Sequence, residues 1–223
     1  MPRDATATRD RLRLAALRRF AEDGIHGART RDIVRDAGQG NASAIGYHFG
    51  DRRGLLVACV APQVEQMETE RREGATALAA TRGVAPVVRA LVEPTAGRLA
   101  TQEGRWFLRL IAQLTDEAGV REHAVPRELA GPEVVAQLAM LEERVAERTG
   151  RSIAAERIGT AVAFLTAALA ERARRVDGGQ EAVLSPDAWT AELVAMLTGA
   201  LLAPVPRAAI SAVARTRVDR ARS

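Results

Sequence analysis

Helix caps and glycines between residues 28 and 56, ARTRDIVRDAGQGNASAIGYHFGDRRGLL, leave few folds open to this chain. Thr30 is a typical N-cap residue, because its side-chain oxygen can accept from an unpaired amide at a helix start. Ile33 and Val34 lie on the apolar face of the helix that follows. Gly38 is expected to end that helix, since glycine adopts the left-handed C-cap conformation without a steric cost.

A second and a third helix start follow directly. Asn41 is placed to cap a short helix whose inward face holds Ile45 and Phe49, four residues apart. Gly50 should close this helix, and Asp51 should cap the next. Two short helices joined by a glycine turn form a helix-turn-helix, in which the second helix lies in the DNA major groove.

These residues resemble the N-terminal DNA-binding domain of the TetR (tetracycline-repressor-like) family of bacterial transcription regulators. The resemblance covers roughly residues 6–60 and rests on order, spacing and caps together: Glu22-Asp23-Gly24-Ile25, Thr30-Arg31-Asp32-Ile33, Ala37-Gly38, Tyr47-His48-Phe49-Gly50 and Arg52-Arg53-Gly54-Leu55-Leu56. Two features differ from the common family pattern. The turn has one residue more, at Gln39-Gly40, and Gly46 stands where many members have a tyrosine. The resemblance implies an all-α protein, a three-helix DNA-binding domain followed by a helical ligand-binding and dimerisation domain.

Composition favours the same fold class. The chain has 223 residues, of which 47% are hydrophobic and only 3% aromatic, and a bias toward Ala and Leu favours helices over strands. A single cysteine, Cys59, excludes a disulfide framework and is expected to be a buried, inert thiol. No apolar run is expected to span a membrane and no signal core begins the chain, so we expect a cytoplasmic protein.

Periodicity and proline or glycine breaks predict about nine helices in three segments. The DNA-binding domain is expected at 1–58, the effector-binding and dimerisation domain at 59–203, and a basic tail at 204–223. After three head helices, a linker helix should run from Asp51 toward Glu73, with a kink at Pro62. Later helices are expected from Pro86 past Arg98, with a bend at Pro94, and at 105–117, 132–149, 152–176 and 186–202.

Charge is distributed unevenly along the chain. The net charge is +4, and both the first 58 residues and the last 20 carry +4 each, which leaves −4 for the middle. A basic head on an acidic body suits a protein that docks one end on DNA. The Arg-rich tail is either an amphipathic helix against the body or a disordered segment that attracts phosphate non-specifically.

By the resemblance, the second head helix reads the DNA and its surroundings hold the backbone. The residues expected to approach base edges are Gln39, Asn41, Ala42, Ser43 and Ala44, since amide and hydroxyl groups can hydrogen-bond there and alanine can meet a thymine methyl. The groups expected near phosphates are Thr30, Arg31, Tyr47, His48 and Arg52 or Arg53, with Arg3 and Arg9 of the N-terminal arm. Gly46 should leave the reading helix loose before it meets DNA.

Two long helices near the C-terminus carry strong apolar stripes at helical spacing. By the resemblance they form a four-helix interface in a homodimer, through Ile158, Val162, Leu165, Leu169, Leu193, Met196, Leu197 and Leu201. The alternative is that the stripes face the core of their own subunit. A dimer is also favoured because a protein that binds two half-sites about one helical turn apart gains both affinity and specificity for its DNA site.

The resemblance also implies a small organic effector bound in the body. Large and polar side chains that could line its pocket are Trp106, Phe107, Leu110, Gln113, Gln137, Met140 and Phe164, although clustered aromatics are more often plain core. No catalytic constellation, cofactor motif or metal pair is found in the sequence.

The predicted function is therefore a repressor that binds an inverted-repeat operator and leaves it when an effector binds. The alternatives are an activator, a regulator without a small ligand, and a nucleoid-type protein that binds DNA of any sequence. An enzyme or a plain interaction module ranks behind these.

Overall fold

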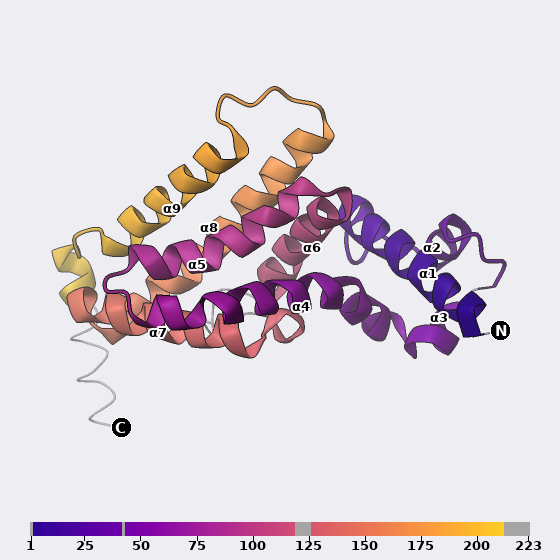
Figure 1. Ribbon diagram of the computed structural model, residues 1–223, viewed down its shortest axis with the longest axis horizontal. Coiled ribbons are helices and arrows are strands. Elements are labelled where there is room, and N and C mark those ends of the chain that lie inside the picture. Colours follow the sequence, from indigo (N-terminus) through magenta and orange to yellow (C-terminus); the bar gives the residue numbers. More distant parts are fainter. Residues whose placement is uncertain (1, 42, 119–125, 212–223) are drawn as a thin grey trace.

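The computed structural model describes residues 2–41, 43–118 and 126–211, and this part of the chain holds nine complete α-helices, further helical residues at 207–211, and no strand. Three helices form a head at one end, and six form a body beside it (Figure 1). The α-helices are α1 (Pro2–Asp23), α2 (Thr30–Asp36), α3 (Ser43–Phe49), α4 (Arg52–Ala79), α5 (Ala85–Ala96), α6 (Gln102–Ala118), α7 (Pro132–Thr149), α8 (Arg151–Asp177) and α9 (Pro186–Leu202), with 3₁₀ turns η1 (Gly97–Ala100) and η3 (Arg127–Leu129).

The turn chemistry of the head follows the sequence expectation with two corrections. Asp51 is the N-cap of α4 and accepts a hydrogen bond from the Gly54 amide at 2.7 Å. Asn41 lies two residues before the start of α3, one residue outside the N-cap position, and accepts a hydrogen bond from the Ser43 amide at 2.9 Å. Gly38 and Gly50 have φ values of 68° and 79°, a left-handed conformation that favours glycine. Thr30 is the first residue inside α2 and not its cap. The cap position is held by Arg29, whose side chain makes no cap hydrogen bond.

The three head helices and the start of α4 enclose one apolar core. The predicted stripe of α1 lies inside it, since Leu12, Ala16, Leu17 and Phe20 have no exposed surface. Ile33 from α2 and Ile45 from α3 are also buried there. Because each short helix contributes so little apolar surface, the core holds the three in place only together.

Helix α4 joins the head to the body, as Figure 1 shows. It runs on through Pro62 to Ala79, six residues beyond the predicted end at Glu73, and then packs against α5 and α7. In the body α6 packs against α8, α7 against α8, and α5 against α9. Pro94 lies inside α5, where the predicted bend does not end the helix, and the change to a 3₁₀ turn comes three residues later at Gly97.

The start of α7 is capped by a carboxylate from another helix. Glu68 of α4 accepts hydrogen bonds from the amides of Glu133 at 2.7 Å and Val134 at 3.1 Å. It passes closely over Gly131, where any side chain would collide with the carboxylate. A carboxylate at a helix N-terminus satisfies free amides and complements the helix dipole.

Helix α8 corrects one expectation from the sequence. An 18-residue window within it has a mean hydropathy of 1.5 and no more than two charged residues, so by length and composition it could cross a membrane. Core helices of soluble proteins pass the same test, which makes this weak evidence for a span. Only 22% of the window is buried in the described structure, so much of this apolar helix faces outward.

Candidate DNA-binding surface

The exposed face of α3 carries small and hydrogen-bonding groups. Ser43, Gly46 and Tyr47 are exposed, and the Tyr47 side chain is 83% accessible although it is a large aromatic group. Ile45 points the other way into the head core. Gly46 has open space around it, since a Cβ built there would meet nothing within 4 Å. This face can therefore approach another surface closely.

The N-terminal flank of α3 continues the same surface. Asn41 is exposed, Gln39 and Ala44 are half-buried, and Ala42 lies outside the described residues. The Asn41 side-chain oxygen already accepts a hydrogen bond from the Ser43 amide, so only its amide nitrogen is left for a base edge. Ser43 has no such constraint on its hydroxyl, and it is the freer of the two for base recognition.

Arg31 and Arg53 are the basic side chains of the predicted phosphate set that extend into solvent, with 73% and 71% of their side chains exposed. Arg53 makes an ion pair of 3.4 Å with Glu128, which lies in the 3₁₀ turn η3 of the body. Exposed pairs of this kind contribute about 0–1 kcal/mol, so a phosphate can compete for Arg53.

Arg52 has a structural role that the sequence did not indicate. Its guanidinium donates to the carbonyls of Ile25 at 2.5 Å and Ala28 at 2.7 Å, and it lies over the Phe20 ring at 5.0 Å. It thereby ties the loop between α1 and α2 to the start of α4. Of the two neighbouring arginines predicted near phosphate, Arg53 is the one whose side chain is available.

The aromatic end of α3 is packed on the N-terminal helix. The rings of Tyr47 and His48 meet edge to face at 4.9 Å, and the guanidinium of Arg9 lies 5.1 Å from the centroid of Phe49. Arg9 therefore holds the end of the reading helix. The side chain of Arg3 is outside the described part of the chain.

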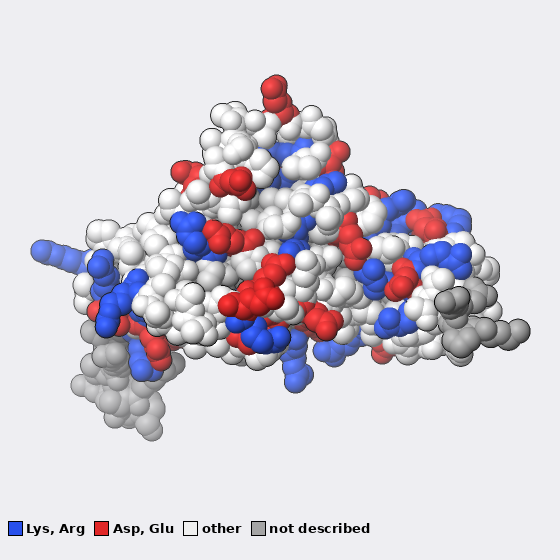
Figure 2. All heavy atoms as spheres, in the orientation of Figure 1, with Lys and Arg blue, Asp and Glu red and all other residues white. Residues whose placement is uncertain are grey.

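Arginine and acidic side chains are intermixed over the head on the face that Figure 2 shows, with no continuous basic patch there. Several of these charges hold the head together. Arg19 of α1 donates to Asp36 of α2 at 2.7 Å, and this bond lowers the pKa of the Asp36 carboxyl. The head therefore has fewer arginines that are exposed and not engaged in ion pairs than its composition indicates.

Gln113, predicted in a ligand pocket, instead joins the body to the head. Its amide oxygen accepts from the Ile25 backbone amide at 2.9 Å, and its amide nitrogen donates to the Phe20 carbonyl at 3.0 Å. Arg13 and Glu103 form a second link between α1 and α6 at 2.6 Å. Three polar contacts therefore join α1 and the loop after it to α6.

The other residues of the predicted pocket lie in different surroundings. Phe107 and Leu110 are buried in the body core, while Trp106 and Met140 pack against its edge. Phe164 points outward with 43% of its surface exposed. Of this predicted set, only Gln137 lines the large cavity described next.

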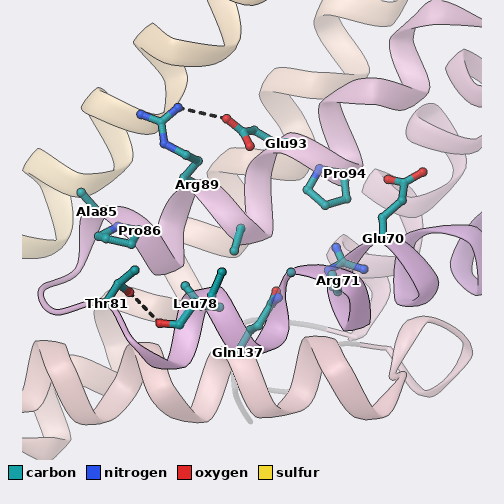
Figure 3. A pocket seen from close by; sticks show the side chains of 13 residues that line it. Glu70, Arg71, Leu78, Thr81, Ala85, Pro86, Arg89, Glu93, Pro94 and Gln137 are labelled. Carbon is teal, nitrogen blue, oxygen red and sulfur yellow. Dashed lines mark hydrogen bonds and ion pairs between the residues drawn. The ribbon is translucent and has the colours of Figure 1, made fainter.

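That cavity, of about 700 Å³, lies between α4, α5 and α7 (Figure 3). Its walls are mostly Gly, Ala, Pro and Leu, with Glu70, Arg71, Arg89, Glu93, Thr81 and Gln137 as the polar lining groups. The cavity lining contains no aromatic residue, so clustered aromatics in the sequence do not mark it. Its signal in the sequence is the run of small residues on α4 and α5.

The predicted dimer residues divide between core and surface. Ile158, Leu169, Leu193, Leu197 and Leu201 are buried within the protomer, as the alternative of stripes that face their own core expects, and their part in a dimer interface stays a prediction. Val162 and Leu165 are half-buried, and Met196 is 50% exposed. Met196 and Phe164 border one apolar hollow on the outer face of α8 and α9.

The described residues hold no group of three or more His, Cys, Asp or Glu side chains that could bind a metal ion. Cys59 is buried, and burial raises the pKa of its thiol to about 12. A thiol in this state is a poor nucleophile at neutral pH.

The comparisons with known proteins point to the head. Residues 12–59 match the family model of "Bacterial regulatory proteins, tetR family". A Rhodococcus protein of known structure, assigned to TetR-family transcriptional regulators, is 22% identical with a TM-score of 0.47, over 88% of this chain and 99% of that one. A similarly assigned protein from Mesorhizobium loti MAFF303099 is 16% identical with a TM-score of 0.46, over 88% and 94%. Both likenesses are too distant to indicate a function, and no curated protein matches the chain.

Proposed function

Because residues 12–59 make this chain a member of the TetR family of bacterial regulatory proteins, we propose that it is a cytoplasmic, non-enzymatic repressor that binds an inverted-repeat operator as a homodimer. The observation that carries the proposal is the capped helix-turn-helix with an exposed α3 face free of charge. An uncharged face with a hydroxyl at Ser43 suits contact with base edges. The division into 1–58, 59–203 and 204–223 stays a prediction, and residues 212–223 of the tail lie outside the described structure.

The exposed groups of the head divide into two roles. Ser43, Gln39 and Asn41, with Ala42 and Ala44 beside them, would meet base edges. Tyr47, Arg31 and Arg53 would hold phosphates, together with His48 and the Thr30 hydroxyl. Phosphate contacts fix the register of a protein on the duplex, whereas base contacts select the sequence.

A second copy of the chain would cover the outer face of α8 and α9. Support comes from the large outward-facing apolar share of α8 and from the hollow beside Phe164 and Met196. Contiguous exposed apolar surface on a soluble protein marks an interaction site. A twofold pair would also place two α3 helices on two half-sites.

A small organic effector in the body would release the DNA. Helix α4 carries Arg53 at the head and Arg71 beside the cavity, and Gln113 fastens α6 to the head loop. A ligand that favours a different arrangement of α4 and α6 would change the spacing of the two heads and lower operator affinity.

The test is selection of fragmented genomic DNA on the purified protein at physiological salt, about 0.15 M, followed by sequencing of the retained fragments. Recovery of a site with two inverted halves is the expected result. Retention of all sequences, lost steeply as salt rises, would replace the proposal with a nucleoid-type protein. No retention at any salt would exclude a DNA-binding role.

A further inference from the structure

The cavity between α4, α5 and α7 is lined by small apolar residues and by six polar side chains. Figure 3 shows Arg71 and Glu70 of α4 at the same end as Pro94 of α5, and Thr81 and Pro86 at the other end. Gln137 of α7 points toward the cavity. A cavity of about 700 Å³ has the size of a small-molecule site.

Two polar side chains of this lining have unused hydrogen-bonding capacity. Gln137 is 5% exposed, and its amide oxygen has no partner among the described residues. The Arg71 side chain is 5% exposed and makes only two long contacts, to Glu68 at 3.5 Å and to Thr95 at 3.3 Å, while its Nε has no partner. A guanidinium has five N–H groups, and buried polar groups are normally satisfied. These two side chains are therefore incomplete without a further partner.

The charge balance around Arg71 favours an anion over a cation. The Glu68 carboxylate is shared with the amides of α7, and Glu70 is held by Arg98 at 2.6 Å, so neither is fully available to Arg71. Burial lowers the pKa of the Arg71 guanidinium, and the neighbouring Glu68 and Glu70 carboxylates oppose this shift. Arg89 and Glu93, also on the lining, pair with each other at 3.0 Å.

We propose that this cavity binds an amphipathic carboxylate, whose carboxylate accepts hydrogen bonds from the Arg71 guanidinium and whose apolar body lies along Gly74, Ala77, Leu78 and Pro86. A planar guanidinium matches the two oxygens of a carboxylate. The Gln137 amide oxygen is an acceptor, so it would pair with a donor elsewhere on the ligand and not with the carboxylate. The inference rests on the proposed function in one respect, that this ligand would be the effector.

Gly74 allows the cavity to be filled without damage to the fold. It lines the cavity in the middle of α4, and a Cβ built on it would meet nothing within 4 Å. Leucine is a better helix former than glycine by about 0.7 kcal/mol, so Gly74→Leu should fold at least as well as the parent. The matched control is Ala79→Leu, an exposed position on the same helix that does not line the cavity.

The experiment is calorimetric titration of the full-length, DNA-free protein with phenylalkanoic acids of increasing chain length, beside the corresponding phenylalkanols and phenylalkylamines. We expect at least one acid to bind about tenfold or more tightly than its alcohol and its amine, as a charge-assisted hydrogen bond predicts. Gly74→Leu should weaken that binding at least tenfold, and Ala79→Leu should leave it unchanged.

Three results would overturn the inference: no acid binds, acids bind no better than alcohols and amines, or Gly74→Leu binds as well as the parent. The genomic selection separates this site from the proposed function. Acid binding without a recovered operator would support the site and reject the repressor. An operator recovered with no acid binding would support the repressor and reject this ligand class.

Discussion

Tyr47 and Ser43 share one exposed helix face, yet they are expected to affect DNA binding differently. Tyr47→Phe removes a hydroxyl that would donate to phosphate, so it should weaken binding about tenfold for every sequence. Ser43→Ala removes a group that would meet a base edge, so it should change which sequence is preferred. Affinity measured on the recovered operator and on single-base variants checks both, and an identical pattern for the two variants would contradict the assigned roles.

Asp36 makes the stability of the head dependent on pH. Its hydrogen bond from Arg19 holds the carboxyl pKa below the usual 3.8, so the stabilisation is complete above that value and is lost as pH falls through the lowered pKa. Asp36→Asn should therefore lower the midpoint of urea unfolding at pH 7. The difference from the parent should shrink toward zero under acid conditions, and a constant difference at all pH values would show that the ionised pair is not its cause.

At the scale of single elements, Gly46 lowers the stability of helix α3, which is expected to read the DNA. Gly46→Ala should raise the free energy of unfolding by about 0.5–1 kcal/mol, because alanine is the better helix former and its Cβ meets nothing. If α3 approaches the groove floor closely, the same methyl should lower operator affinity. Chemical denaturation and operator titration of one variant test both effects, and a gain in both stability and affinity would exclude the close approach.

Sequence patterns located elements best where they contained explicit signals. The bounds of α7 and α9 agree with prediction because a proline opens each, and Gly150, with φ 80°, follows the first. The predicted end of α4 at Glu73 precedes Gly74, a residue type that often ends helices, but α4 continues through Gly74 to Ala79, and the left-handed glycine of this region is Gly83. Partners distant in sequence were not predictable, as with Gln113 and Ile25, which lie 88 residues apart.

The candidate site was likewise predictable where local sequence signals mark it and not where it depends on residues distant in sequence. The α3 face follows from local spacing and caps, so its exposed residues could be named from sequence alone. The cavity is built by three helices and lined by small side chains, whose meeting depends on tertiary packing. Arg52 looked like its neighbour Arg53, and only the carbonyls of the α1–α2 loop distinguish their roles.

At the scale of the whole molecule, the proposed dimer can be tested by substitutions on the outer face of α8 and α9. Met196→Glu places a charge on the exposed apolar hollow and should convert the dimer to monomer in analytical ultracentrifugation, with loss of inverted-repeat binding. Val183→Glu, at a fully exposed position between the two helices, is the control and should remain dimeric. A parent that is monomeric at micromolar concentration, or a dimeric Met196→Glu, would reject this interface.

The ion pair between Arg53 and Glu128 also bears on how the protein senses ionic strength. A phosphate that takes Arg53 leaves the Glu128 carboxylate close to the duplex, where its negative charge offsets the positive charge just delivered. Fewer cations then leave the DNA for this contact than for one made by Arg31, whose ion-pair partner among the described residues is Asp32 of its own helix. Glu128 of the body thus acts as a counterion for Arg53 of the head. Operator occupancy would therefore depend less steeply on the cellular salt concentration than the number of surface arginines implies.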